Sequence, residues 1–326
     1  LRTDLGRDFN PGLAWIGMAT TIVGAVLALS QTDVKRLLAF SSMSQLGYII
    51  TAVALMSHIG WVTALYLVAN HMLVKGILFL AIAGIIMRTS TRSLHDLGGL
   101  APAMPLTCVV IGVALLSMSG LPPLMGFGGK WLLLSAMVDK GWTGLAVAGA
   151  FATFLGLWYM LRLFTAFFLR PPPTKMQSPE EAPAILFVAH TPLIGGILIL
   201  SLFPKLLMEP VSAAIDPVFA ANLVWQGQSL ETIYGLWNPA PVMGLSVAAA
   251  AILFLGWRGL SRLLGHRLSL GDWIMTARPL PAKATPALAE TLWRTMDRAT
   301  HRLATVAQHV YTGDGQAYVL WVLAYF

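Results

Sequence analysis

A histidine and a lysine lie four residues apart in the middle of a long apolar stretch. His71 and Lys75 are the only basic side chains between residues 61 and 87. Positions four residues apart project from the same face of a helix, where Asn70 and Tyr66 lie nearby. Two titratable nitrogens on one stripe can pass a proton between them through water. The pair therefore predicts a proton relay.

The same two residues also have a purely structural explanation. His71 would be a neutral core histidine bonded to a backbone carbonyl, and Lys75 would extend its ammonium group to a membrane interface. A lysine at the centre of a membrane helix costs about 2.5–3.5 kcal/mol on insertion scales, and reaching the interface from mid-span is geometrically strained. A relay is therefore the favoured hypothesis, and the structural explanation stays open.

Lys130 follows a pattern that breaks a helix. The apolar stretch 104–138 would be roughly 50 Å long as one helix, whereas a hydrocarbon core is roughly 30 Å thick. Residues 120–123 read GLPP, and glycines recur at 126, 128 and 129; proline removes backbone donors and glycine tolerates unwound backbone. A discontinuous helix with a charge at its break is typical of transporter ion sites. The alternative is a kink used only for packing, with Lys130 near an interface.

The remaining polar groups near these stretches have ordinary interpretations. Lys35 and Arg36 stand between two apolar runs, where basic residues are most often cytoplasmic anchors. The run that follows contains a polar stripe that can hold water, formed by Ser41, Ser42, Ser44 and Gln45. Arg162 and His190 lie near the ends of their stretches and are interpreted as structural or interfacial.

The elements that must position these residues are membrane helices. Of 326 residues, 57% are apolar and 11% are charged, and the mean hydropathy of +0.73 is well above that of a soluble domain. The net charge of +7 is interpreted as basic loops kept on one side of a membrane, not as a nucleic-acid surface. The single cysteine, Cys108, offers neither a disulfide nor a cysteine metal site. Phosphate-binding loops, paired histidine metal ligands and serine elbows are absent from the sequence.

Seven apolar spans predict an all-α polytopic bundle with a discontinuous helix. They cover residues 12–30, 37–56, 61–87, 104–138, 142–169, 185–203 and 242–257, and a last apolar piece, 318–326, is too short to cross a membrane. Basic residues alternate between the loops, which predicts a cytoplasmic side for the richer set. That set is Lys35, Arg36, Arg88, Arg92, Arg170, Lys175, Arg258, Arg262 and Arg267, against Lys140 and Lys205 on the other side.

The rest of the chain divides by composition. Residues 1–11 form an extracytoplasmic lead-in, 12–170 contain the candidate site, 171–270 add further membrane helices, and 271–326 form a more polar segment. Within that segment, apolar residues from 288 to 310 recur at spacings of three, four and seven after a proline at 286, which predicts an amphipathic helix. Residues 208–239 have no clear period and are expected to form an extracytoplasmic loop with a short interfacial helix.

Three motifs in order resemble a known family. Residues 32–48 read TDVKRLLAFSSMSQLGY, residues 70–79 read NHMLVKGILF, and residues 119–130 read SGLPPLMGFGGK. Together they are similar to the antiporter-like, proton-translocating subunits shared by respiratory complex I, Mrp-type cation/proton antiporters and membrane-bound hydrogenases. The glycine-rich end of the third motif, followed by Trp131, is closest to Mrp D-type and hydrogenase-type members.

The resemblance implies roles for four residues. In that family two inverted five-helix units each contain a broken helix, and this chain looks like the second unit, with the first preceding Leu1. Lys35 would link the units, His71 would be a central relay, and Lys130 would be the terminal lysine of the broken helix. Lys75 falls where the family often has lysine.

The resemblance also implies a setting and a function. The chain would translocate protons, or exchange them for sodium, as one membrane component of an NADH-quinone oxidoreductase-like, hydrogenase-like or Mrp-type complex in a bacterial cytoplasmic membrane. Its partners would be other membrane subunits and lipid, and it would bind no flavin, iron–sulfur cluster, nicotinamide or metal itself. Two alternatives are a stand-alone secondary transporter for a small solute and a structural membrane scaffold.

Overall fold

The computed structural model describes residues 4–173, 179–219, 223–232 and 235–239, together with most positions from 241 to 256. Five of its helices are long and apolar enough to cross a membrane. They are α1 (Asp4–Ser30), α2 (Val34–Ala54), α3 (His58–Thr89), α6 (Thr143–Phe164) and α7 (Ala184–Leu202). Helix α6 continues directly into a π-helical turn, η1 (Thr165–Leu169). An all-α integral membrane protein is therefore confirmed.

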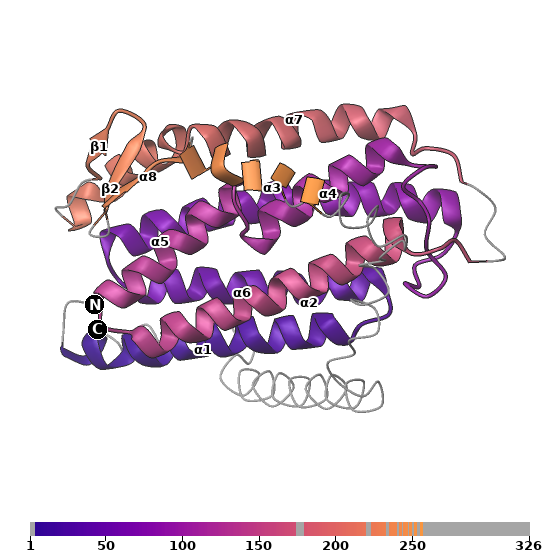
Figure 1. The fold of residues 1–326 in the computed structure, drawn as a ribbon. Coiled ribbons are helices and arrows are strands. Elements are labelled where there is room, and N and C mark those ends of the chain that lie inside the picture. Colours follow the sequence, from indigo (N-terminus) through magenta and orange to yellow (C-terminus); the bar gives the residue numbers. More distant parts are fainter. Residues whose placement is uncertain are drawn as a thin grey trace, which may run out of the picture. The chain divides into compact units, whose positions relative to one another are not determined.

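The predicted break in the fourth span is present. Helix α4 (Pro105–Ser119) and helix α5 (Met125–Asp139) are separated by the GLPP segment and Leu124. Gly120 ends α4 in the left-handed conformation, with φ of +76°, as glycine does at many helix C-termini. The two halves therefore have free ends inside the protein (Figure 1).

Local capping explains where two of the long helices begin. The carboxylate of Asp33 accepts hydrogen bonds from the backbone amides of Lys35 and Arg36 at 2.8 and 3.2 Å. The hydroxyl group of Ser57 accepts a bond from the amide of Gly60. Both residue types satisfy amides that the first helical turn leaves without partners.

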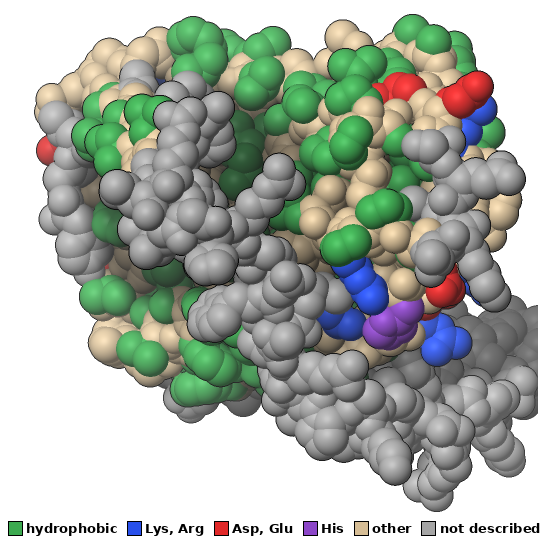
Figure 2. Space-filling view, turned by 45° about the vertical axis from the view of Figure 1, so that its right-hand side comes forward, with side chains coloured by type: hydrophobic (Ala, Val, Ile, Leu, Met, Phe, Trp, Pro, Cys, Tyr) green, Lys and Arg blue, Asp and Glu red, His purple; other side chains and the backbone are tan. Residues whose placement is uncertain are grey.

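The connections gather at two ends of the described chain, as the alternating loops predict. At one end Arg92 pairs with Asp33 at 3.1 Å, and the amide of Leu100 bonds to the carbonyl of Phe167 at 3.0 Å. At the other end Lys140 donates to the carbonyl of Leu55. Figure 2 shows most of the visible charged and histidine side chains on the right of its view, with apolar side chains elsewhere. The charged side chains that this view shows therefore gather at one group of loops.

The segment after α7 is more ordered than predicted. It contains helix α8 (Lys205–Phe219) and a three-stranded antiparallel sheet, β1 (Trp225–Gln226), β2 (Ser229–Thr232) and β3 (Gly235–Trp237). The short helix was expected and the sheet was not, because strands of two to four residues are too short to show an alternating pattern. The side chain of Trp237 is buried among Tyr66, Met125 and Met208.

Several predicted segments fall where the description is incomplete. Every described position from 241 to 256 is helical, with gaps between them. The predicted amphipathic helix at 285–310 and the last apolar piece, 318–326, lie outside the described residues.

Candidate functional site

Lys75 is buried against α2 and does not extend to a membrane interface. Its side chain is 6% exposed. The ammonium nitrogen donates to the hydroxyl oxygen of Ser41 at 2.6 Å and to the carbonyl oxygen of Leu38 at 2.7 Å. Both acceptors belong to the facing helix, so the lysine side chain crosses from α3 to α2. The structural explanation based on snorkelling therefore does not describe Lys75.

Lys130 lies at the free end of the other half of its own broken helix. Its side chain is 3% exposed, and the ammonium nitrogen donates to the carbonyls of Met118 and Ser119, each at 3.1 Å. The last carbonyls of a helix lack partners within it and form the negative end of its dipole. A cation is stabilised at that point. Lys130 is therefore held by α4, although it belongs to α5.

Gly120 is required at this junction. A Cβ atom at this residue would lie 2.5 Å from Cδ of Lys130, too close for any real contact. The positive φ of Gly120 also disfavours other residues. The glycine therefore makes room for the lysine at the break.

Tyr48 lies beneath the Lys130 ammonium group. The nitrogen is 5.0 Å from the centre of the tyrosine ring, within the range of a cation–π interaction. The hydroxyl group of Tyr48 bonds to the carbonyl of Gly149 at 3.0 Å and lies 2.8 Å from the hydroxyl oxygen of Thr153. The ring is thus fixed between the lysine and α6.

One face of α2 connects the two lysines. Its buried polar residues recur at spacings of three and four, and we call them the α2 stripe. Lys75 contacts the first member and Lys130 lies over the last, seven residues further along, or about 10 Å at 1.5 Å per residue. The stripe is formed by Ser41, Ser44, Gln45 and Tyr48.

Tyr159 of α6 adds a further polar group to this face. Its side chain is fully buried, and its hydroxyl group faces Ser44 and Gln45. The spacing of the serines and the glutamine predicted a water-holding stripe, but Tyr48 and Tyr159 were both missed. For Tyr48 a signal existed, because it continues the helical spacing of the stripe. Tyr159 comes from a distant helix, and no spacing could have indicated it.

His71 lies one helical turn before Lys75 on α3. Its ring is partly buried, and its Nδ1 atom is buried with no hydrogen-bond partner in the part of the chain that the structure describes. Next to it, Asn70 accepts a bond of 2.6 Å from the hydroxyl group of Ser117 in α4. Buried polar atoms without partners are unusual in stable cores. His71 is therefore placed beside the broken helix with one nitrogen available.

Lys35 is separate from the other candidate residues. It lies in the first turn of α2, its side chain is exposed, and its backbone amide bonds to Asp33. The structure therefore brings together His71, Lys75 and Lys130 but leaves Lys35 at the end of the bundle, as its position alone predicts for an anchor.

Arg162 and His190 both contact neighbouring helices. Arg162 donates to the carbonyl of Leu29 at the end of α1. His190 is 2% exposed, and its Nε2 atom lies 3.2 Å from the carbonyl oxygen of Ile77 in α3. These contacts agree with structural roles, although His190 is buried and not interfacial.

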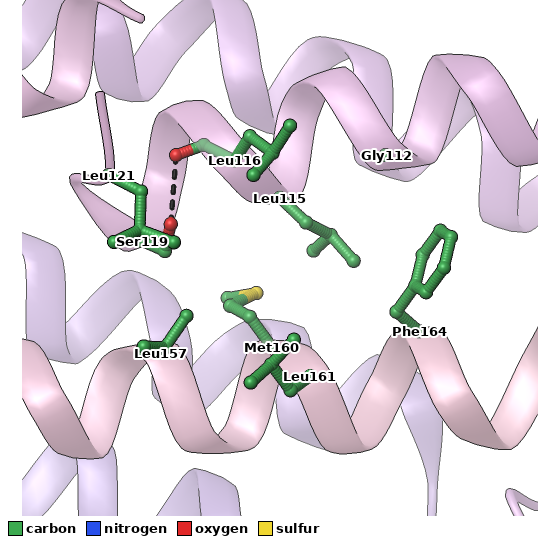
Figure 3. Close-up of a pocket in the computed structure, with 9 residues that line it drawn as sticks. All are labelled: Gly112, Leu115, Leu116, Ser119, Leu121, Leu157, Met160, Leu161 and Phe164. Carbon is green, nitrogen blue, oxygen red and sulfur yellow. Dashed lines mark hydrogen bonds between the residues drawn. The ribbon is translucent and has the colours of Figure 1, made fainter. Parts of the chain in front are cut away.

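An apolar pocket lies beside the break. It has a volume of about 220 Å³, lies between α4 and α6, and is open on one side. Figure 3 shows that its lining is almost entirely aliphatic and aromatic, which suits hydrocarbon and lacks the convergent polar groups that fix a small polar solute. The residues that line it are Gly112, Leu115, Leu116, Ser119, Leu121, Leu157, Met160, Leu161 and Phe164.

Metal ligation is not evident at the site. Within the described ranges, no group of three or more histidine, cysteine, aspartate or glutamate residues could hold a metal ion. Glu181, in the connection between η1 and α7, bonds to the start of α4.

Comparison with known proteins points to one family. Residues 4–156 match the sequence model of the family described as NADH:quinone oxidoreductase/Mrp antiporter, TM. The NADH-quinone oxidoreductase subunit N of Desulforudis audaxviator is 34% identical over 212 residues, which is 61% of this chain and 42% of that protein. One subunit of the Na(+)/H(+) antiporter of Bacillus subtilis is 29% identical over 341 residues, which is 95% of this chain and 40% of that protein.

A solved structure agrees with this assignment. A chain of the membrane-bound sulfane sulfur reductase, an archaeal respiratory membrane complex, aligns with a TM-score of 0.70 and 28% identity, over 97% of this chain and 55% of that one. The present chain thus spans about half the length of the proteins that it matches, or less. The matched segment contains α1 to α5, the α2 stripe and all three clustered basic residues. The chain belongs to the antiporter-like superfamily of membrane subunits, represented by the NADH:quinone oxidoreductase/Mrp antiporter family.

Proposed function

We propose that this chain translocates protons across a membrane along the path from Lys75 through the α2 stripe to Lys130. One observation carries the proposal: two buried lysines contact the two ends of a single polar stripe on α2. A buried lysine normally pairs with a carboxylate. Among the residues described, neither lysine has an acidic partner, and both bond to neutral oxygens instead.

Neutral partners make the lysines suited to proton exchange. Carbonyl and hydroxyl oxygens stabilise an ammonium group less strongly than a carboxylate does, so the proton can leave without separating an ion pair. A serine hydroxyl both donates and accepts, so Ser41 can receive a proton from Lys75 while releasing its own to water or to the next polar group. Tyr48 and Tyr159 extend this series towards Lys130.

His71 would supply or remove the proton at Lys75. The two residues share a helical face, and the free Nδ1 of His71 provides an acceptor one turn from the lysine. We propose that residues 12–170 form one proton-conducting unit, because they contain all of these groups. Lys35 is exposed at the end of α2, so any role for it would require a neighbouring subunit or segment.

The wider setting is part of the same proposal. The relatives carry the names of subunits of NADH-quinone oxidoreductase and of a Na(+)/H(+) antiporter. We therefore propose that the chain works beside other membrane subunits, which would supply the rest of the proton path. Exchange with sodium is a second candidate, because carbonyls at the end of a half-helix, such as those of Met118 and Ser119, are known to coordinate that ion.

Substitution of Lys130 tests the proposal. In vesicles containing the assembled complex, Lys130→Ala should reduce coupled proton uptake by at least tenfold while the protein remains inserted. Lys205→Ala is the matched control, because Lys205 forms only a surface pair with Glu209 at 3.8 Å. Normal uptake by Lys130→Ala at normal protein levels would refute the assignment.

A further inference from the structure

Helix α4 is capped by an acid from a distant part of the chain. Its own N-cap residue, Met104, makes no side-chain bond. Instead, the carboxylate of Glu181 accepts hydrogen bonds from the amide of Leu106 at 2.8 Å and from the hydroxyl group of Thr107 at 2.6 Å. Glu181 lies just before α7, more than seventy residues later in the chain. This contact satisfies an amide in the first turn and places a negative charge at the positive end of the helix dipole.

Glu181 is itself anchored to α3. The Nε atom of Arg88, in the last turn of α3, donates to the backbone carbonyl of Glu181 at 3.0 Å. The guanidinium group also pairs with Glu180 at 3.4 Å. The carboxylate of Glu181 therefore reaches α4 from a backbone that is attached to the helix carrying His71 and Lys75.

The opposite end of α4 holds the ammonium group of Lys130. The helix has 15 residues, so the two ends are about 22 Å apart. Its first turn bonds to Glu181, and the carbonyls of Met118 and Ser119 in its last turn accept from Lys130. A hydrogen-bonded helix moves along its axis as a unit. A shift at the capped end therefore displaces the carbonyls at the lysine.

We infer that Glu181 is a positioning residue for proton transfer, which holds α4 at the axial position where its last carbonyls meet Lys130. The inference rests on the proposed function. Glu181 touches none of the relay groups and acts through α4. Its effect depends on the side-chain oxygens that bond to Leu106 and Thr107, and not on its pairing with the surface charges around it.

Three variants separate these features, measured by proton uptake in vesicles containing the assembled complex. Glu181→Ala removes both bonds and should slow uptake at least tenfold. Glu181→Gln keeps an oxygen for the Leu106 amide and should retain at least a third of the normal rate. Glu180→Ala is the matched control, because that neighbouring acid contacts only Arg88, has a side chain that is 84% exposed, and should leave uptake unchanged.

Hydrogen exchange of the α4 amides provides the second measurement. Glu181→Ala should accelerate exchange in α4 at least tenfold and leave exchange in α1 unchanged. If Glu181→Ala does not assemble, Thr107→Val removes the hydroxyl contact alone and should give a smaller loss of uptake in the same direction. The inference is wrong if α4 loosens while uptake stays normal, or if the glutamine variant is as slow as the alanine variant.

Failure of the proposed function would look different. In that case Lys130→Ala would pump normally in the same vesicles. Faster α4 exchange in Glu181→Ala would then still support the cap, whereas unchanged exchange would overturn it. The two results are therefore read independently.

Discussion

The ammonium nitrogen of Lys75 lies 2.6 Å from the hydroxyl oxygen of Ser41, across the interface between α3 and α2. This contact connects a lysine in the middle of one membrane helix to the first member of a polar stripe on another. A charged group buried without an acid needs such acceptors, because desolvation otherwise excludes its protonated form. Ser41 is therefore the first residue to test beyond the lysines.

Ser41→Ala should slow proton uptake by roughly three- to tenfold. The variant leaves the carbonyl of Leu38 as an acceptor for Lys75, so the ammonium group keeps one hydrogen bond of a charged kind, worth about 1.5–3 kcal/mol. Ser42→Ala is the control, because its hydroxyl group bonds only to its own helix at the carbonyl of Leu38. Equal effects of both substitutions would show that the serines act on helix packing and not on the lysine.

His71 and Lys75 should behave as consecutive steps of one path. His71→Ala and Lys75→Ala should each slow uptake at least tenfold, and the double variant should be scarcely slower than the worse single variant, because interrupting a serial path twice adds little. The measurement is the uptake rate of all four proteins at matched protein levels. Independent, multiplying losses would assign the two residues separate structural roles.

The pH profile tests whether His71 carries the proton. Histidine is the side chain whose ordinary titration falls between pH 5 and 8. His71→Gln keeps a polar group but cannot titrate, so its uptake should lose the part of the pH dependence that falls in this range. An unaltered profile at a normal rate would leave His71 with a packing role.

Gly120→Ala should damage the Lys130 site through contact. The added Cβ would meet Cδ of Lys130 at 2.5 Å, which should displace the lysine from α4 and reduce uptake at least tenfold. Gly141→Ala is a close control, because Gly141 has a similar positive φ of +80° and no atom within 4 Å of its Cβ position. Both variants carry a backbone strain of about 1–2 kcal/mol. Equal losses in both would mean that strain, not contact with Lys130, explains the effect.

The two ends of the bundle should be accessible from opposite sides of the membrane. Cys108 is the single cysteine, so Cys108→Ser provides a background for His95→Cys and Lys205→Cys, two positions in loops at opposite ends. The positive-inside bias predicts that the first reacts with a membrane-impermeant thiol reagent only from the cytoplasmic face and the second only from the other face. Labelling of both from one face would require a different number of spans between them.

The sequence by itself determined the class of protein, the broken helix and the pairing of His71 with Lys75. Each follows from local chemistry: an apolar run too long for one span contains glycine and proline, and residues four apart share a helical face. The same spacing explains why the serines of α2 could be recognised as a polar stripe. Residue spacing along one helix is a one-dimensional property, so it can be read without the fold.

Only the tertiary structure decided which of these groups meet. The contact of Lys75 with α2, the position of Lys130 over Tyr48 and the cap provided by Glu181 depend on how each helix is rotated and shifted against its neighbour. The period of an apolar helix leaves that rotation and shift open, because membrane helices that are apolar all round have no single buried face. For the same reason the sequence could not separate exposed Lys35 from the buried lysines, since the packing of the facing helix determines which ammonium group loses its water.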